Sequence, residues 1–167
     1  VQRRHSRLLG EAANARLVRP LSEDSNVEMI SGAALLCPAE RFHEIGGFDE
    51  EIFLFCEDDD LAVRFKKAGY DLAYVHDAVV EHAGGSSSQT SVELDRFKAY
   101  HFMRSGLYGR QKHGLAIRRR HQLALCTWKY CLGWLMFDRR QRAKYAGYLT
   151  ALREPVKIDG KIVQSRG

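Results

Sequence analysis

Residues 46–88 read GGFDEEIFLFCEDDDLAVRFKKAGYDLAYVHDAVVEHAGGSSS, and this stretch decides how the chain folds. Four consecutive carboxylates, Glu57 to Asp60, follow an apolar run, and apolar residues then recur at helical spacing up to Gly69. Carboxylates at the start of a helix face its positive end and its four unbonded N–H groups. Such a position can hold a carboxylate ionised for proton abstraction or orient it toward a cation.

The elements around this stretch are predicted from hydrophobic periodicity and from Gly and Pro positions. Helices are expected over 38–45, 58–68, 92–113, 119–137 and 139–153. Buried or short strands are expected over 27–37, 70–75 and 78–81, with a break at Asp77, and a loop over 84–91. Helices that alternate with short strands favour the α/β class.

Length and composition indicate one folded domain. The chain has 167 residues, of which 45% are hydrophobic and 28% charged, which is ordinary for a globular protein. It begins with Val1, and residues 1–20 are polar and Arg-rich without the apolar core of a signal peptide. We therefore expect the chain to be part of a longer protein.

The positive charge is concentrated in one segment. Residues 118–144 hold eight Lys or Arg and one Asp, a net charge of +7, whereas the whole chain carries +5 and the remainder therefore −2. This distribution argues against a protein that binds nucleic acid over its whole surface, and no nucleic-acid partner is expected. It favours a local anionic partner.

The cysteines do not indicate a zinc site or a disulfide. They stand at positions 37, 56, 126 and 131, without a CxxC pair and without a secretory context. Free thiols in a reducing compartment are the simpler interpretation.

Five motifs in order carry a family resemblance. They are GGFDE (46–50), EDDDL (57–61) with Arg64, KKAGY (66–70), a strand that ends at His82, and GGSS (84–87). Together they resemble the C-terminal half of family 2 glycosyltransferases, especially rhamnosyltransferase-like enzymes of bacterial polysaccharide assembly. The resemblance extends upstream through SGAALL (31–36) and downstream to Tyr108, Lys112 and His113, so that it covers about residues 27–113.

The resemblance implies a fold and a division of the chain. The expected fold is α/β: part of a GT-A (Rossmann-like) glycosyltransferase domain with a helical C-terminal extension. Residues 1–26 would lead in from a nucleotide-binding half that precedes Val1, residues 27–113 would form the acceptor and catalytic half, and 114–167 a basic-aromatic extension. Asp58 to Asp60 superficially match the DxD metal motif, but they follow GGFDE, where the family places acceptor-side carboxylates. Without the nucleotide half we expect this chain alone to be inactive.

The same resemblance assigns catalytic and acceptor-binding residues. Asp58, with Glu57 beside it, would be the base that takes the proton of the acceptor hydroxyl in an inverting transfer. The predicted acceptor-binding residues are Gly32, Gly47, Phe48, Asp49 and Asp60. An acidic cap at the start of a helix is the simpler alternative for the carboxylate row, and packing is the alternative for the glycines.

A second group of residues is expected on the side of the donor, a nucleotide-sugar. His82 would contact the cation and the donor diphosphate, with Ser86 and Arg104 on the same side. The cation, Mg²⁺ or Mn²⁺, would be held mainly by the preceding half. A structural histidine and a solvated basic helix face remain the alternatives. Ser105 after Arg104 and the pair Cys37-Pro38 depart from the family pattern.

Residues 122–137 form an apolar stretch that contains Trp128 and Trp134 and is flanked by basic residues. It is shorter than the roughly 20 residues that span a bilayer. An apolar stripe with aromatic and basic neighbours suits a helix on an anionic membrane surface. A core helix that packs on the domain is the alternative that the sequence leaves open.

These inferences combine into one expected function. The chain would belong to an enzyme that transfers a sugar to a hydroxyl of a glycan or lipid-linked acceptor in bacterial cell-surface polysaccharide synthesis. It would lie in the cytoplasm, peripheral on the inner face of the plasma membrane. A non-catalytic membrane- or glycan-binding module is the rival, because it would need the basic-aromatic helix but not the acidic row. A metal-dependent phosphoesterase would need more His and Asp ligands than the motif region offers.

Overall fold

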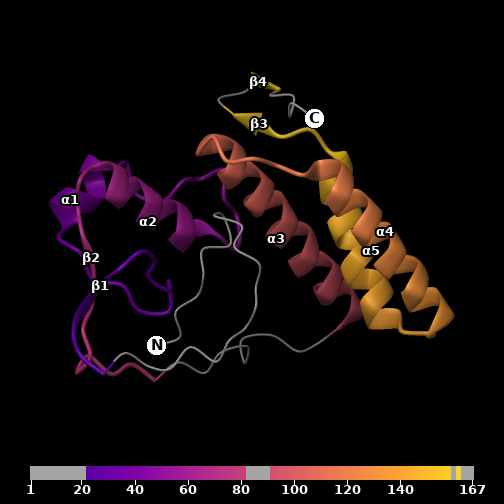
Figure 1. The fold of residues 1–167 in the computed structure, drawn as a ribbon, viewed down its shortest axis with the longest axis horizontal. Helices are drawn as coiled ribbons and strands as arrows, with labels where there is room; N and C mark the ends of the chain where they lie inside the picture. Colours follow the sequence, from indigo (N-terminus) through magenta and orange to yellow (C-terminus); the bar gives the residue numbers. More distant parts are fainter. Residues whose placement is uncertain (1–21, 82–90, 159–160, 163–167) are drawn as a thin grey trace. The chain divides into compact units, whose positions relative to one another are not determined.

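The computed structural model describes residues 22–81, 91–158 and 161–162, and packing divides the chain into two compact units. Unit 1 comprises residues 1–52 and 56–85, and unit 2 comprises 53–55 and 86–167. Unit 1 contains β1 (Ser25–Val27), α1 (Ala39–Glu44), α2 (Glu57–Lys67) and β2 (Leu72–Tyr74) (Figure 1). Unit 2 contains α3 (Val92–Lys112), α4 (Arg119–Leu135), α5 (Arg139–Arg153), β3 (Lys157–Ile158) and β4 (Lys161–Ile162). The division predicted from the sequence, into residues 1–26, 27–113 and 114–167, is based on expected function and differs from these two units. It stays a prediction.

All five predicted helices are present, with ends within two residues of the predicted ones. Helix α2 shows why. Its apolar residues Leu61, Ala62 and Phe65 lie on one face and are buried. Gly69 (φ +87°) ends it, because a left-handed residue there lets the Tyr70 N–H donate to the Phe65 carbonyl (3.0 Å). The rings of Phe65 and Tyr70 then meet at 5.9 Å, the apolar contact that usually accompanies this type of helix end.

The core of unit 1 lies between α2 and a two-stranded antiparallel sheet. Strands β1 and β2 pair with Val27 opposite Leu72, and both side chains are buried against α2. Phe42 and Ile45, from the end of α1, pack against the same cluster. The His76 N–H donates to Asp24 Oδ1 (2.7 Å), so the sheet is fastened just beyond its last paired residues.

Two strand predictions were wrong. The expected buried strand over 27–37 does not form beyond Val27, where the pairing of β1 ends. The apolar residues that follow include Leu36, which is 97% exposed. Residues 78–81 form no strand, and Val79 is 84% exposed. A strand needs a neighbouring strand for its backbone N–H and C=O groups, and β-favouring composition cannot supply one.

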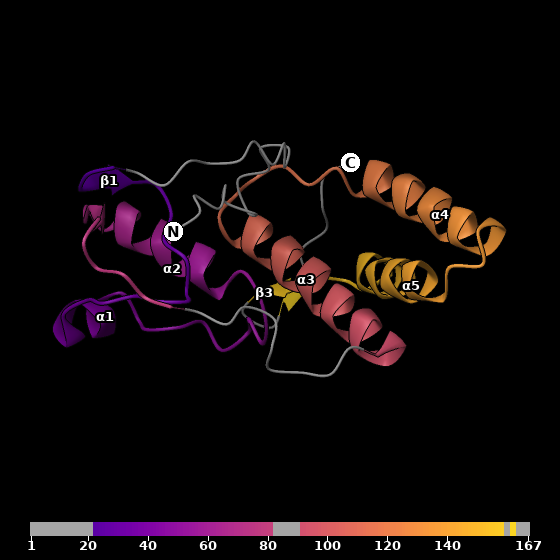
Figure 2. The ribbon, with the colours of Figure 1, turned by 90° about the horizontal axis from the view of Figure 1, so that it is seen from below.

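Unit 2 is built on three helices, with α5 packed against both α3 and α4. Figure 1 and Figure 2 both show these helices side by side. Close contact depends on Gly147, since a Cβ atom there would lie 2.3 Å from the Arg96 carbonyl oxygen of α3. Gly133 of α4 plays the same part toward α5, because a Cβ atom there would lie 3.0 Å from Arg142 Cγ. Small residues thus let the backbones approach.

The far end of α5 is closed by side chains from the other two helices. The Arg119 guanidinium of α4 donates to the carbonyls of Leu152 (2.6 Å) and Glu154. The Tyr100 hydroxyl of α3 donates to Glu154 Oε2 (2.6 Å). A cation at the negative end of a helix is favourable, so these contacts fix where α5 stops.

Two features of unit 2 concern the C-terminal segment. Strands β3 and β4, which the sequence analysis did not predict, form an antiparallel pair with Lys157 opposite Ile162. Across the described part of the chain, no helix combines the length and the apolar character that crossing a membrane requires.

Candidate active site

The acidic row lies at the first turn of α2, where the chain enters the helix through a strained backbone. Glu57 to Asp60 form that first turn, and the last turn carries Arg64, Lys66 and Lys67, so both ends complement the helix dipole. Phe55 (φ 65°) and Cys56 (φ 66°) are both left-handed, which costs about 1–2 kcal/mol for each non-glycine residue. Such strain concentrates at functional sites.

Asp58 is held by the backbone of a distant segment. The Gly32 N–H donates to its Oδ2 (2.9 Å), and the Asp59 N–H donates to its Oδ1 (3.0 Å). Gly32 permits this approach, because a Cβ atom there would lie 3.3 Å from Asp58 Cβ. A carboxylate can accept about four hydrogen bonds, so both oxygens keep capacity for a further donor.

Glu57 lies next to Asp58 and has an unusual environment. Its Oε2 atom is buried and has no hydrogen-bond partner among the described residues. A buried polar atom without a partner costs about 1–3 kcal/mol, and more when it is charged. Native structures rarely keep such an atom without a ligand, water or function to explain it.

Asp60, which is predicted to lie on the acceptor side, is buried in the protein. Its side chain is 0% exposed, and its Oδ2 accepts from Arg64 Nε (2.8 Å). The other two nitrogens of the Arg64 guanidinium donate to the carbonyls of Ile45 and Gly47, both at 2.6 Å. Asp60 therefore contacts the protein, and through Arg64 it fixes the turn after α1 to α2.

The turn after α1 holds the other predicted acceptor-side residues. Gly47 (φ +65°) has the left-handed backbone that glycine favours, and its Cβ would lie 3.3 Å from the Phe42 ring. Phe48 is 51% exposed and meets Phe42 edge-on at 5.4 Å. Asp49 Oδ1 accepts from the Glu51 N–H (3.0 Å) and so stabilises the turn. Of these residues, Phe48 presents the largest surface to a ligand.

The predicted donor-side residues are not brought together by the described structure. Arg104 lies on α3 in unit 2, and its Nη1 donates to the Pro155 carbonyl (2.8 Å). His82 and Ser86 lie outside the described residues. The contacts that join predicted site residues are those of Gly32 with Asp58 and of Asp60 with Gly47 through Arg64.

The described carboxylates do not form a complete metal site. Within 22–81, 91–158 and 161–162, no group of three or more His, Cys, Asp or Glu side chains could hold a metal ion. Consecutive residues on a helix differ by about 100° in direction, so neighbouring carboxylates find different partners. The described residues alone therefore do not make up a cation site.

Unit 2 contains a groove that the sequence analysis missed. It has a volume of about 510 Å³, and its lining combines aromatic rings with charges of both signs: Phe55, Phe102, Tyr145, Tyr148, Lys98, Arg140, Lys144, Asp95 and Asp138. Arg140 donates to both oxygens of Asp95 (2.5 and 3.1 Å), and this hydrogen-bonded ion pair holds the pKa of Asp95 below its usual value. Such a lining, with aromatic rings and polar groups together, suits a glycan-like ligand.

A sequence signal for this groove did exist. Lys144 and Tyr148 are four residues apart on α5, and Lys98 and Phe102 are four residues apart on α3, so each pair lies on one helix face. The missing information was that α3 and α5 pack against each other, which places the two faces side by side.

A comparison with protein families matches the first half of the chain. Residues 15–84 match a family described as the N-terminal domain of galactosyltransferase. The matched range ends at residue 84, one residue before the end of unit 1. The acidic row, Gly32 and the turn with Phe48 all lie within it.

Two curated relatives are rhamnosyltransferases. N-acetylglucosaminyl-diphospho-decaprenol L-rhamnosyltransferase of Mycobacterium tuberculosis is 45% identical over 56 residues, which make up 34% of this chain and 18% of that protein. Rhamnosyltransferase WbbL of Escherichia coli is 38% identical over 52 residues, 31% of this chain and 20% of that protein. No solved structure matches the chain. The matches thus span about a fifth of each relative.

The comparisons confirm the predicted resemblance to glycosyltransferases. A mainly helical structure with few short strands is consistent with part of a glycosyltransferase domain. The family and the relatives bear the names of different donor sugars, galactose and rhamnose.

Proposed function

We propose that this chain carries the base and the acceptor side of a glycosyltransferase. The enzyme would transfer a sugar from a nucleotide-sugar to a hydroxyl of a glycan or lipid-linked acceptor, with inversion, in bacterial cell-surface polysaccharide synthesis. The observation that supports this most directly is the environment of Asp58, which the Gly32 N–H holds at the first turn of α2. The match over residues 15–84 adds the class of chemistry.

In this proposal Asp58 accepts the proton of the acceptor hydroxyl. A general base must hold its carboxylate in one orientation while the hydroxyl oxygen attacks the donor carbon. The bonds from Gly32 and Asp59 engage one lone pair on each oxygen and thereby fix the orientation. The remaining lone pairs can accept the proton. Glu57 would be the second carboxylate of the pair, beside Asp58 in the first turn of α2.

Phe48 would provide the apolar contact for the acceptor ring. Its side chain is exposed, and its orientation is supported by the edge of Phe42. An aromatic face packs well against the C–H surface of a sugar, whereas the hydroxyls need polar partners. Asp60 and Arg64 would position this turn relative to Asp58 without touching the acceptor.

The donor and the cation remain outside what the described residues supply. A divalent cation, when bound, would stabilise the nucleoside diphosphate leaving group. His82, Ser86 and Arg104 stay proposed donor-side residues.

The experiment is transfer by the enzyme that contains this chain, assayed with a nucleotide-sugar and a glycan acceptor. We expect Asp58→Asn to lower kcat by about 10² to 10⁴, the usual effect of losing a general base, while donor binding persists. The matched control is Asp77→Asn, which removes the same charge from an exposed turn of the same unit. An Asp58→Asn enzyme that keeps most of its kcat would refute the assignment. A wild type that binds glycan but transfers no sugar would instead favour the glycan-binding module.

A further inference from the structure

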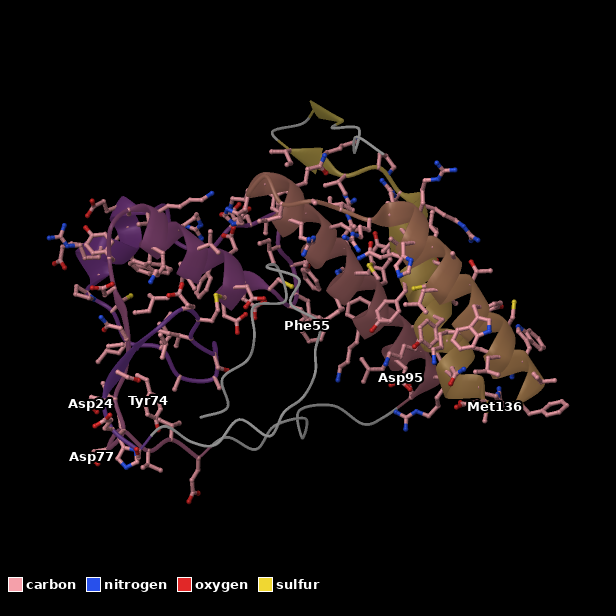
Figure 3. The ribbon with its side chains drawn as sticks, viewed as in Figure 1. Asp24, Phe55, Tyr74, Asp77, Asp95 and Met136 are labelled. Atoms are coloured by element: carbon pink, nitrogen blue, oxygen red, sulfur yellow. The ribbon has the colours of Figure 1, made fainter. Side chains whose placement is uncertain are left out.

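The turn between α4 and α5 exposes a group of large apolar side chains. We call Trp134, Leu135, Met136 and Phe137 the apolar tip. Leu135 is 77% exposed and Phe137 86%, and the other two are also exposed. Figure 3 shows Met136 where the two helices join. Exposed apolar clusters with polar surroundings usually mark an interaction site.

The backbone of the tip does not explain why Phe137 is there. Phe137 (φ 54°) is the left-handed residue that ends α4, and the Asp138 N–H donates to the Gly133 carbonyl (2.9 Å). This helix ending favours glycine, because a side chain at positive φ is strained. A glycine would make the same turn with less strain, so the phenyl ring must serve something other than the turn.

Cations are concentrated beside the tip. The first turn of α5 contains Arg139 and Arg140, while Asp138 caps the helix and accepts from the Gln141 N–H (2.9 Å). The Arg142 guanidinium lies 4.0 Å from the centre of the Trp134 ring, which adds a further cation beside the tip. Arg139 and Arg142 therefore favour an anionic partner at the tip.

These two features point to one occupant, an anionic membrane surface. We propose that the apolar tip enters the interfacial region of an anionic bilayer while Arg139 and Arg142 contact lipid phosphates. Apolar and aromatic side chains favour the interface, and each cation near an anionic surface adds attraction. A second copy of the chain is a poor occupant, because two tips would bring arginines together.

The structure changes the form of the membrane contact that the sequence suggested. Residues 118–144 do not form one helix lying flat, because they fold into α4 and the beginning of α5. The basic group 118–120 lies at the other end of α4, about 25 Å away for its 17 residues. One end of the hairpin, rather than the whole stripe, would meet the lipid.

The test is co-sedimentation of the 167-residue chain with vesicles of phosphatidylcholine alone or mixed with phosphatidylglycerol. The wild type should bind the anionic vesicles, and binding should fall as salt rises. Phe137→Gly should keep or raise the melting temperature because it relieves strain. It should nevertheless weaken binding at least tenfold, since the buried ring is lost. If Phe137 were needed only for folding, Phe137→Gly would instead lower the melting temperature.

Matched variants separate the tip from general charge and hydrophobicity. Arg139→Gln should weaken binding to anionic vesicles about fivefold. Arg153→Gln removes the same charge at the opposite end of α5 and should have little effect. Leu36→Ser removes an exposed apolar side chain from unit 1 and should also have little effect.

Three outcomes would overturn the proposal. The first is wild-type protein that stays in the supernatant with anionic vesicles, which would leave an acidic protein as the occupant. The second is a Phe137→Gly variant that binds as tightly as the wild type. The third is equal loss of binding in Arg139→Gln and Arg153→Gln, which would mean a diffuse charge effect.

Discussion

The pair of Asp60 and Arg64 provides the sharpest test of how unit 1 holds its site. Replacing Arg64 with Met removes three hydrogen bonds, to Asp60 Oδ2 and to the carbonyls of Ile45 and Gly47. The Arg64 side chain is 16% exposed and that of Asp60 0%, so water cannot replace the guanidinium. The substitution takes the guanidinium away from a carboxylate in the core.

The expected cost follows from this burial. Removing one partner of a buried ion pair destabilises by about 3–5 kcal/mol. The free energy of unfolding of a typical domain is only about 5–15 kcal/mol. At about 1.4 kcal/mol per factor of ten, the opening equilibrium of unit 1 should rise by about 10² to 10⁴.

Hydrogen exchange of the α2 amides measures this opening directly. Protection of α2 should fall by the same factor in Arg64→Met. Both tryptophans, Trp128 and Trp134, lie in unit 2, so their fluorescence reports whether that unit stays folded. The double variant Asp60→Leu/Arg64→Met should recover much of the protection, because it buries no charge.

An exposed ion pair in the same unit is the matched control. Arg41 and Glu44 pair at 2.8 Å with side chains 53% and 52% exposed, and Arg41→Met should change protection of α2 little. The reasoning is refuted if Arg64→Met is as mild as Arg41→Met. It is also refuted if the double variant is no better protected than Arg64→Met alone.

Two further predictions concern unit 2. Gly147→Ala should destabilise unit 2 by about 1–3 kcal/mol, because the new methyl group meets the Arg96 carbonyl. Gly106→Ala in α3 is the control: its methyl group meets no atom, and it should stabilise the unit slightly. Equal melting temperatures for the two variants would contradict this prediction. Burial among aromatic rings lowers the pKa of His101, so folding favours the neutral imidazole. The contribution of His101 to stability should therefore be fully present above its ordinary pKa of about 6.5. It should decline as the pH falls below that value. Melting curves across that range should show the decline in the wild type and a smaller one in His101→Phe; parallel curves would contradict it.

The helices could be predicted because their signals are local. Pro38 before α1 and Gly69 after α2 mark helix ends through the backbone angles that these residues favour. The spacing of Leu61, Ala62 and Phe65 indicates a buried face within a few residues. None of this needs information from distant parts of the chain.

The strands were harder to predict because pairing is a contact between distant segments. Residues 27–37 and 78–81 have the composition of strands, but of these residues only Val27 pairs with another strand. It is the last residue of β1 (Ser25–Val27), which pairs with β2 (Leu72–Tyr74). The β3–β4 pair was missed because two-residue strands carry no readable alternation, although Asp159-Gly160 between them is a typical hairpin signal.

The sequence by itself placed four carboxylates at the start of α2 and a basic, aromatic stretch near the C-terminus. Only the tertiary structure separated Asp58, bound by Gly32 from 26 residues away, from Asp60, buried against Arg64. Likewise only the packing of α4 on α5 decided which apolar residues are covered and which, like Phe137, meet solvent. The physical reason is the same in both cases: residue type and spacing set the helix and its faces, whereas partners and burial depend on which distant segment packs against each face.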